Sequence, residues 1–135
     1  MIYVETSVAL AQLLAEDQCP PESLWTATLV SSRLTEYEVW TRVHARGLSS
    51  SHGESVRLLL GRLSWLELMP VVLARALEPW PVAVRTLDAL HLASIEFLRA
   101  RGQDVTLASY DGRLISAARR LSIPLFPLSP GGAQR

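Results

Sequence analysis

This sequence contains no lysine, so all of its 13 basic residues are arginines. They are balanced by 13 acidic residues, and the formal net charge at pH 7 is zero. A chain without net charge has no general attraction for nucleic acid, so binding of such a polyanion must depend on a local group of side chains. Arginine makes the better two-pronged contacts with phosphate, and its exclusive use here is compatible with such a group.

Cysteine and long apolar runs are also scarce. Cys19 is the only cysteine, which excludes an intramolecular disulfide and a zinc site made of several thiolates. The amino terminus has no basic segment before its apolar residues and carries Glu5, so we expect no secretory signal peptide. No uncharged apolar run approaches the roughly 18 residues that a spanning helix needs. We therefore expect a soluble, cytoplasmic protein.

The 135 residues are sufficient for one domain with a substantial core. We expect that domain over residues 1–129 and a flexible tail over 130–135. Hydrophobic residues make up 49% of the chain, which is high for a small monomer and suggests that a partner or a second subunit covers apolar surface. The four tryptophans are scattered singly, so we expect them in the core or at an interface.

Short apolar runs alternate with helical patterns, which indicates an α/β protein with a mainly parallel sheet. The expected strands cover residues 2–4, 28–32, 65–69, 104–109 and 123–128. The expected helices cover residues 8–14, 34–46, 52–63, 71–77, 85–100 and 114–121. Prolines interrupt the last strand, which places it at a sheet edge. We expect Thr6 or Ser7, the serines at 49–51, and Thr86 to cap the helices that follow them.

Acidic side chains stand at the ends of expected strands or in the first turns of expected helices. Glu5 follows the first strand, Asp111 follows the fourth, and Asp88 begins the fifth helix. The carboxyl ends of parallel strands meet at one edge of a sheet, where ligands bind. Glu36 and Glu38 both lie early in the second helix, but about 200° apart around it. Only one of these two acids can therefore face that edge, and periodicity does not say which.

Several carboxylates in one cleft repel each other and are driven towards protonation unless a cation joins them. Oxygen ligands suit a hard ion such as Mg²⁺ or Mn²⁺, which activates water and stabilises phosphodiester oxygens. Asp88 also has a purely structural interpretation, as a first-turn acid that complements the helix dipole. His44 and His52 have no ligand-like spacing with each other or with His91, and we interpret them as surface or packing residues.

Four segments carry a recognisable family pattern: I-Y-V-E-T-S-V-A-L at the start, S-R-L-T-E-Y-E-V, D-A-L-H-L-A, and L-A-S-Y-D-G-R-L. They resemble, in order, a strand followed by D-T-S, an S-x-L-T-x-x-E segment, the segment of a third acid, and a strand followed by T-x-D-x-x-L. D-A-L-H at this distance before the last segment is the most specific of them. Together they resemble the PIN-domain proteins, and more narrowly the VapC-type toxins of type II toxin–antitoxin pairs.

The resemblance implies a three-layer α/β/α sandwich around a central, mainly parallel sheet. It also implies an endoribonuclease that depends on Mg²⁺ or Mn²⁺ and hydrolyses phosphodiester bonds of tRNA or another structured RNA. A homodimer and a cognate VapB-type antitoxin that neutralises the toxin are implied as partners. These are expectations about fold, activity, cofactor and partners that rest on the family.

The resemblance also assigns site residues. The catalytic and metal-binding acids it implies are Glu5, Glu38, Asp88 and Asp111. Ser7 and Ser109 match small hydroxyl positions that orient the acids, and Glu36 becomes the acid that faces solvent. The candidates for RNA phosphate contacts are Arg42, Arg85 and Arg113.

Glu5 departs from the family, which usually has aspartate at this position. The extra methylene displaces the carboxylate, and Mg²⁺ demands near-octahedral geometry. One alternative is therefore a catalytically weakened PIN-like protein that binds RNA or its antitoxin. Another is a phosphatase or response-regulator-like domain, which also places acids at strand ends but would need a lysine for phosphate.

Overall fold

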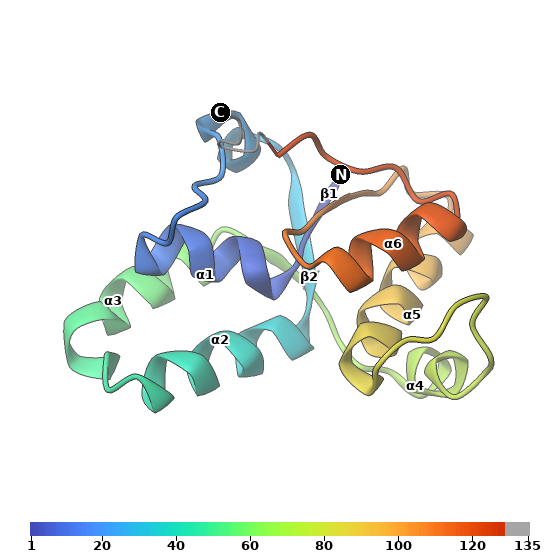
Figure 1. The fold of residues 1–135 in the computed structure, drawn as a ribbon, viewed down its shortest axis with the longest axis horizontal. Coiled ribbons are helices and arrows are strands. Elements are labelled where there is room, and N and C mark those ends of the chain that lie inside the picture. Colours follow the sequence, from blue (N-terminus) through green and yellow to red (C-terminus); the bar gives the residue numbers. More distant parts are fainter. Residues whose placement is uncertain (129–135) are drawn as a thin grey trace.

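The computed structural model describes residues 1–128 (Figure 1). The expected tail at 130–135 and the expected domain end at 129 lie outside these residues. Within them, the centre of the fold is a parallel sheet of four strands in the order β3-β2-β1-β4. The strands are β1 (Ile2–Val4), β2 (Leu29–Ser32), β3 (Ser64–Leu66) and β4 (Thr106–Ala108).

Helices cover both faces of this sheet (Figure 1). They are α1 (Thr6–Leu14), η1 (Glu22–Thr26), α2 (Arg33–Ala45), α3 (Ser49–Leu60), α4 (Pro70–Ala76), α5 (Thr86–Ala100) and α6 (Gly112–Arg120). One face packs against α1, α2 and α3, and the other against α5 and α6, with α4 lying on α5. The three-layer α/β/α sandwich is therefore confirmed.

The central strand β1 shows why the sheet forms here. Ile2 and Val4 point into the core beneath α1–α3, while Tyr3 points into the core beneath α5 and α6. All three residues are buried, as a short apolar run between two layers of helices predicts. The tryptophans pack as expected, with Trp80 against the second core and the others against the first.

Register in the sheet sets the position of the acids. Val4 pairs with Ala108, so the residues that follow, Glu5 and Ser109, leave the sheet side by side. Helix α2 begins directly after β2, and α6 begins at Gly112, with Asp111 as the N-cap two residues beyond Ser109. Parallel pairing therefore brings chain segments about a hundred residues apart to one edge of the sheet.

The predicted strand at 123–128 is wrong. This segment forms one isolated parallel bridge, Leu107 with Leu125, beside β4. Leu107 donates its N–H to the Pro124 carbonyl and accepts one from Phe126. Pro124 has no N–H to donate, so the ladder cannot continue towards the start of the segment.

The predicted helix caps are also wrong. The residues preceding α1, α3 and α5 are Glu5, Leu48 and Arg85, and each helix begins before or at the hydroxyl residues expected to cap it. At α5 the carboxylate of Asp88 accepts the Arg85 N–H, and Thr86 is the first residue of the helix. A residue inside the helix cannot be its N-cap.

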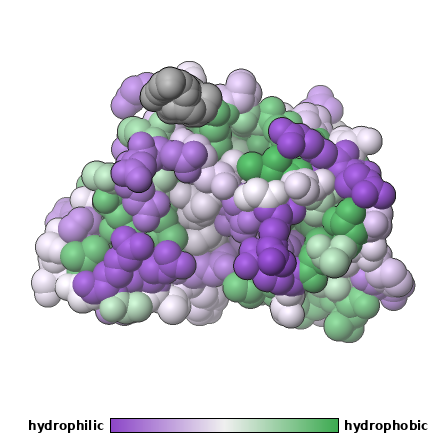
Figure 2. Space-filling view, in the orientation of Figure 1, coloured by the Kyte–Doolittle hydropathy of each residue, from purple (hydrophilic) through white to green (hydrophobic). Residues whose placement is uncertain are grey.

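The surface carries apolar residues over α4, where Val71, Leu73 and Leu77 are exposed. Hydrophobic colouring reaches the surface at the lower right of Figure 2, in the region of this helix. Within residues 1–128, no helix has the length and apolar character needed to cross a membrane.

Candidate active site

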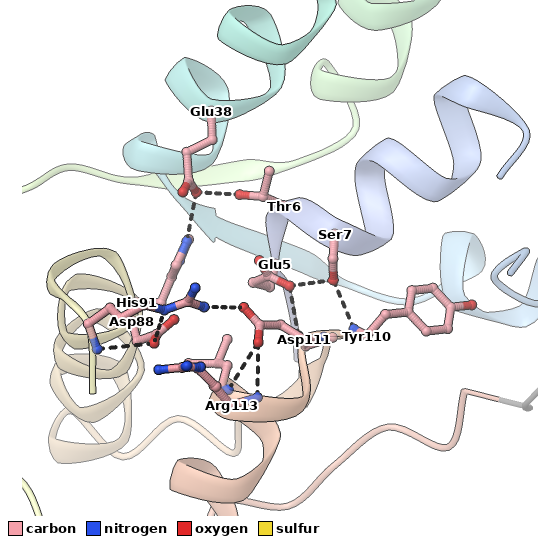
Figure 3. Close-up of polar contacts among 12 residues, drawn as sticks. Glu5, Thr6, Ser7, Glu38, Asp88, His91, Tyr110, Asp111 and Arg113 are labelled. Carbon is pink, nitrogen blue, oxygen red and sulfur yellow. Dashed lines mark hydrogen bonds and ion pairs between the residues drawn. The ribbon is translucent and has the colours of Figure 1, made fainter. Parts of the chain in front are cut away.

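The four predicted acids line one cleft at the carboxyl edge of the sheet. Glu5, Glu38, Asp88 and Asp111 share a hollow of about 360 Å³. Figure 3 shows them approaching from β1, α2, α5 and the start of α6. A neighbouring hollow of about 520 Å³ also contains Glu5, Glu38 and Asp111, and extends over Arg42. The fold thus creates a continuous acidic cleft with basic side chains around it.

Glu5 is held by two serine hydroxyls and is 6% exposed. Ser7 and Ser109 both donate to its Oε1, at 2.5 and 2.7 Å. The same serines accept backbone N–H groups of Tyr110 and Asp111, which ties the β4–α6 turn to β1. Burial raises the pKa of Glu5, and the nearby His91 and the hydroxyl bonds offset this only in part. The longer glutamate is therefore accommodated in a polar cradle.

Glu38 faces the cleft from the second turn of α2. Its Oε1 accepts hydrogen bonds from Thr6 Oγ1 at 2.5 Å and from His91 Nε2 at 2.9 Å. Burial acts to raise the pKa of Glu38, but the His91 and Thr6 contacts outweigh it and hold that pKa below its ordinary value. Glu36 lines neither hollow and pairs with Arg33 at 3.1 Å.

Asp88 combines the two interpretations that the sequence left open. Its Oδ2 accepts the backbone N–H of Arg85 at 3.2 Å and lies 3.3 Å from the Nε of the same residue. These contacts stabilise the start of α5, as a first-turn acid should. The side chain is nevertheless on the wall of the cleft, beside the other acids.

Asp111 caps α6 and faces the cleft with its second oxygen. Its Oδ1 accepts the backbone N–H groups of Arg113 and Leu114, at 3.0 and 3.4 Å. Its Oδ2 lies 3.3 Å from Nη2 of Arg85. One carboxylate therefore both begins a helix and contributes charge to the site.

His91 is the site residue that the sequence analysis missed. Its Nδ1 lies 2.7 Å from the Tyr3 hydroxyl, and its Nε2 contacts Glu38. A signal was available, because His91 follows Asp88 by three residues and so shares its helix face. Spacing between histidines does not reveal it, because the partners of His91 are a tyrosine and a glutamate.

The three candidate arginines occupy different places. Arg85 spans Asp88 and Asp111, and its side chain is 57% exposed. Arg42 lines the larger hollow. Arg113 is exposed in the first turn of α6 and contacts Asp111 through its backbone N–H.

Among the described residues, no three acids or histidines are placed as a group ready to hold a metal ion. The acids share a cleft, but hydroxyls, backbone N–H groups and Arg85 currently hold their side chains.

Comparison with known proteins supports a nuclease. No protein-family profile matches the chain. Two curated ribonucleases of Mycobacterium tuberculosis, VapC35 and VapC47, are 30% and 29% identical to it, and the alignments cover 99% of this chain and 100% of each relative. The crystal structure of VapC20 from the same species, a toxin that cleaves the sarcin–ricin loop, has a TM-score of 0.65 at 17% identity and covers 87% of this chain and 95% of its own.

A second crystal structure, PAE2754 from Pyrobaculum aerophilum, has a TM-score of 0.59 at 19% identity, covering 86% of this chain and 78% of its own. The parallel sheet and the two solved structures that resemble it define the fold of a PIN domain. The chain belongs to the VapC ribonuclease family, to which its full length aligns. It is an endoribonuclease toxin.

Proposed function

We propose that RNA cleavage by this protein depends on a divalent cation, Mg²⁺ or Mn²⁺, held by Glu5, Glu38, Asp88 and Asp111. The observation that carries the proposal is their convergence from four separate elements on one cleft. Carboxylate oxygens are the donors that hard divalent cations prefer. The electrostatic repulsion among four such groups is a physical reason for a cation to bind there.

The distribution of hydrogen bonds supports this assignment. In Glu5, Glu38 and Asp88 one oxygen receives two contacts, and among the described residues the other receives none. In Asp111 the oxygen not used by the helix contacts Arg85. Glu5, Glu38 and Asp88 are thus each fixed to the protein by one oxygen, and the second oxygen of Asp111 is held only by the half-exposed Arg85, so the donor set fits a hard cation.

A bound cation would supply positive charge for the RNA phosphate and a more acidic water. The chain itself orients the acids through Ser7, Ser109 and Thr6, and draws the phosphate backbone towards the cleft with arginine. We assign phosphate contacts to Arg42, Arg85 and Arg113. The assignment is supported by Arg42 in the larger hollow, Arg85 on the wall of the acidic cleft and the exposed Arg113 in the first turn of α6.

We further propose a structured RNA, tRNA or another folded RNA, as the substrate, and a cognate VapB-type antitoxin as the inhibitor. Membership of the VapC family supports both. We propose that the protein forms a homodimer, and the exposed apolar residues of α4 support this. We also propose a cytoplasmic location, because folded RNA substrates are present there. Light scattering of the purified chain measures its oligomeric state directly.

The test of metal dependence uses protein freed of metal with EDTA, end-labelled tRNA and structured rRNA fragments, and added Mg²⁺ or Mn²⁺. We expect cleavage only after a cation is restored, and loss of cleavage in E38Q. The matched control is E36Q, which removes an acid from the same helix outside the cleft. Cleavage at full rate in EDTA, or by E38Q, would show that the proposal is wrong.

A further inference from the structure

A line of hydrogen bonds runs through the interior to Glu38. The Tyr3 hydroxyl contacts His91 Nδ1 at 2.7 Å, and His91 Nε2 contacts Glu38 Oε1 at 2.9 Å. Thr6 donates to the same Glu38 oxygen. The four residues come from β1, α5, α2 and α1, so the line joins both helical layers of the fold. Figure 3 shows its His91, Glu38 and Thr6 members.

The identity of the groups determines the direction of each bond. A carboxylate can only accept, so His91 Nε2 must carry the proton that points to Glu38. In the neutral imidazole Nδ1 is then an acceptor, and it takes its hydrogen bond from the Tyr3 hydroxyl. Tyr3 is fully buried and keeps its proton, because burial raises its pKa.

We propose that His91 is a positioning residue for Glu38, and that Tyr3 fixes the His91 ring for this purpose. Thr6 and His91 together hold Oε1, and among the described residues Oε2 has no hydrogen bond and remains available to a cation in the cleft that Glu38 lines. This inference rests on the proposed function, because the oriented oxygen is the one offered to the cation. Residues that hydrogen-bond to a metal ligand commonly orient that ligand. Here His91 would orient Glu38, and Tyr3 would orient His91.

Packing favours this role over a histidine that merely fills space. His91 is 2% exposed, and both of its ring nitrogens have partners. A glutamate has three rotatable side-chain bonds, and two donors from different helices restrict them together. Because the Glu38 side chain is already restricted before a cation binds, less conformational entropy is lost on binding.

The first measurement uses the metal-free protein. Two-bond ¹⁵N–¹H NMR of labelled histidine reports which ring nitrogen carries the proton. We expect His91 with a protonated Nε2, and a weakened signature of this form in Y3F. A His91 ring with an unprotonated Nε2 would overturn the inference, whatever the metal requirement of cleavage.

The second measurement compares variants. H91L removes both hydrogen bonds, whereas H91Q retains an N–H donor at about the distance of Nε2 from the backbone. The matched control is L92A, which truncates a fully buried neighbour on α5 that packs in the second core. It lowers the melting temperature without removing a contact to Glu38.

For H91L we expect Mn²⁺ affinity and kcat to fall at least about tenfold, with KM for RNA little changed. H91Q should recover most of that loss, and L92A should match the unsubstituted protein in both quantities. Equal Mn²⁺ affinity in H91L, H91Q and the unsubstituted protein would overturn the inference and leave the proposed function standing. Failure of the unsubstituted protein to bind any divalent cation would instead overturn the proposed function, and the inference with it.

Discussion

Arg85 and Asp111 meet across the cleft, with 3.3 Å between Nη2 and Oδ2, while Nε of the same guanidinium lies 3.3 Å from Asp88 Oδ2. The arginine thus lies between two of the acids assigned to the cation. Its pKa is raised by the Asp88 hydrogen bond and, to a smaller extent, by the charge of Asp111. In this arrangement Arg85 and a divalent cation compete for Asp111 Oδ2, and the guanidinium charge lies between two of the acids.

We therefore expect R85Q to bind Mn²⁺ a few-fold more tightly than the unsubstituted protein, the modest effect that an exposed ion pair allows. The same variant should bind RNA less well, because it lacks the Arg85 guanidinium that we assign to an RNA phosphate. Calorimetric titration with Mn²⁺ and the KM for RNA measure the two effects. R113Q removes another arginine near the cleft, one that contacts Asp111 through its backbone N–H, and serves as the control for Mn²⁺ binding. Weaker Mn²⁺ binding by R85Q would contradict the prediction.

Glu5 gives a pH-dependent prediction. Its pKa is raised by burial in the native state, so between its ordinary value and that raised value the native protein binds more protons than the unfolded chain. Stability in EDTA should therefore decrease as pH rises through this window. E5Q lacks the buried charge, and we expect it to melt a few degrees higher near pH 7.5.

The advantage of E5Q over the unsubstituted protein should shrink as pH falls towards the ordinary glutamate value, where both side chains are neutral. Thermal melts across this pH range measure the difference. An advantage that is independent of pH would mean that the substitution acts by packing and not by charge.

Asp88 should separate activity from stability. D88N keeps a side-chain oxygen that can accept the Arg85 N–H, so we expect the free energy of unfolding to change by no more than about 1 kcal/mol. Loss of the negative charge should abolish cleavage and the stabilisation by Mn²⁺. Melts with and without Mn²⁺, together with an RNA cleavage assay, test both parts. A variant that still cuts RNA would leave Asp88 with its helix-capping role alone.

Ser109 supports two acids at once, since its hydroxyl donates to Glu5 and accepts the backbone N–H of Asp111. S109A leaves a buried partner without its bond, and we expect it to lower the free energy of unfolding by about 1–3 kcal/mol. It should also reduce cleavage, because both carboxylates lose a restraint. The control S51A removes an exposed hydroxyl on α3 and should alter neither quantity. An unchanged cleavage rate in S109A would argue against the orienting role.

The α/β alternation and the edge position of the acids were predictable because they depend on local patterns. The apolar run at residues 2–4 is followed at once by Glu5, and D-A-L-H-L-A opens a helix with Asp88 in its first turn. Helical geometry also showed that Glu36 and Glu38 point in different directions. Only the resemblance to a family, and then the structure, distinguished between them.

Other features depended on contacts between distant segments. His91 meets Glu38 across 53 residues and Tyr3 across 88, and no periodicity within one element encodes such pairs. The extent of pairing at 123–128 and the identity of the helix caps also depended on tertiary structure. In both cases the outcome is set by which donors and acceptors lie beside each backbone group in the fold. The sequence by itself determined which residues are acidic and on which element each lies, because strand and helix periods are local. Tertiary structure alone decided which oxygen of each acid is held and which faces the cleft, because hydrogen-bond partners are supplied by packing.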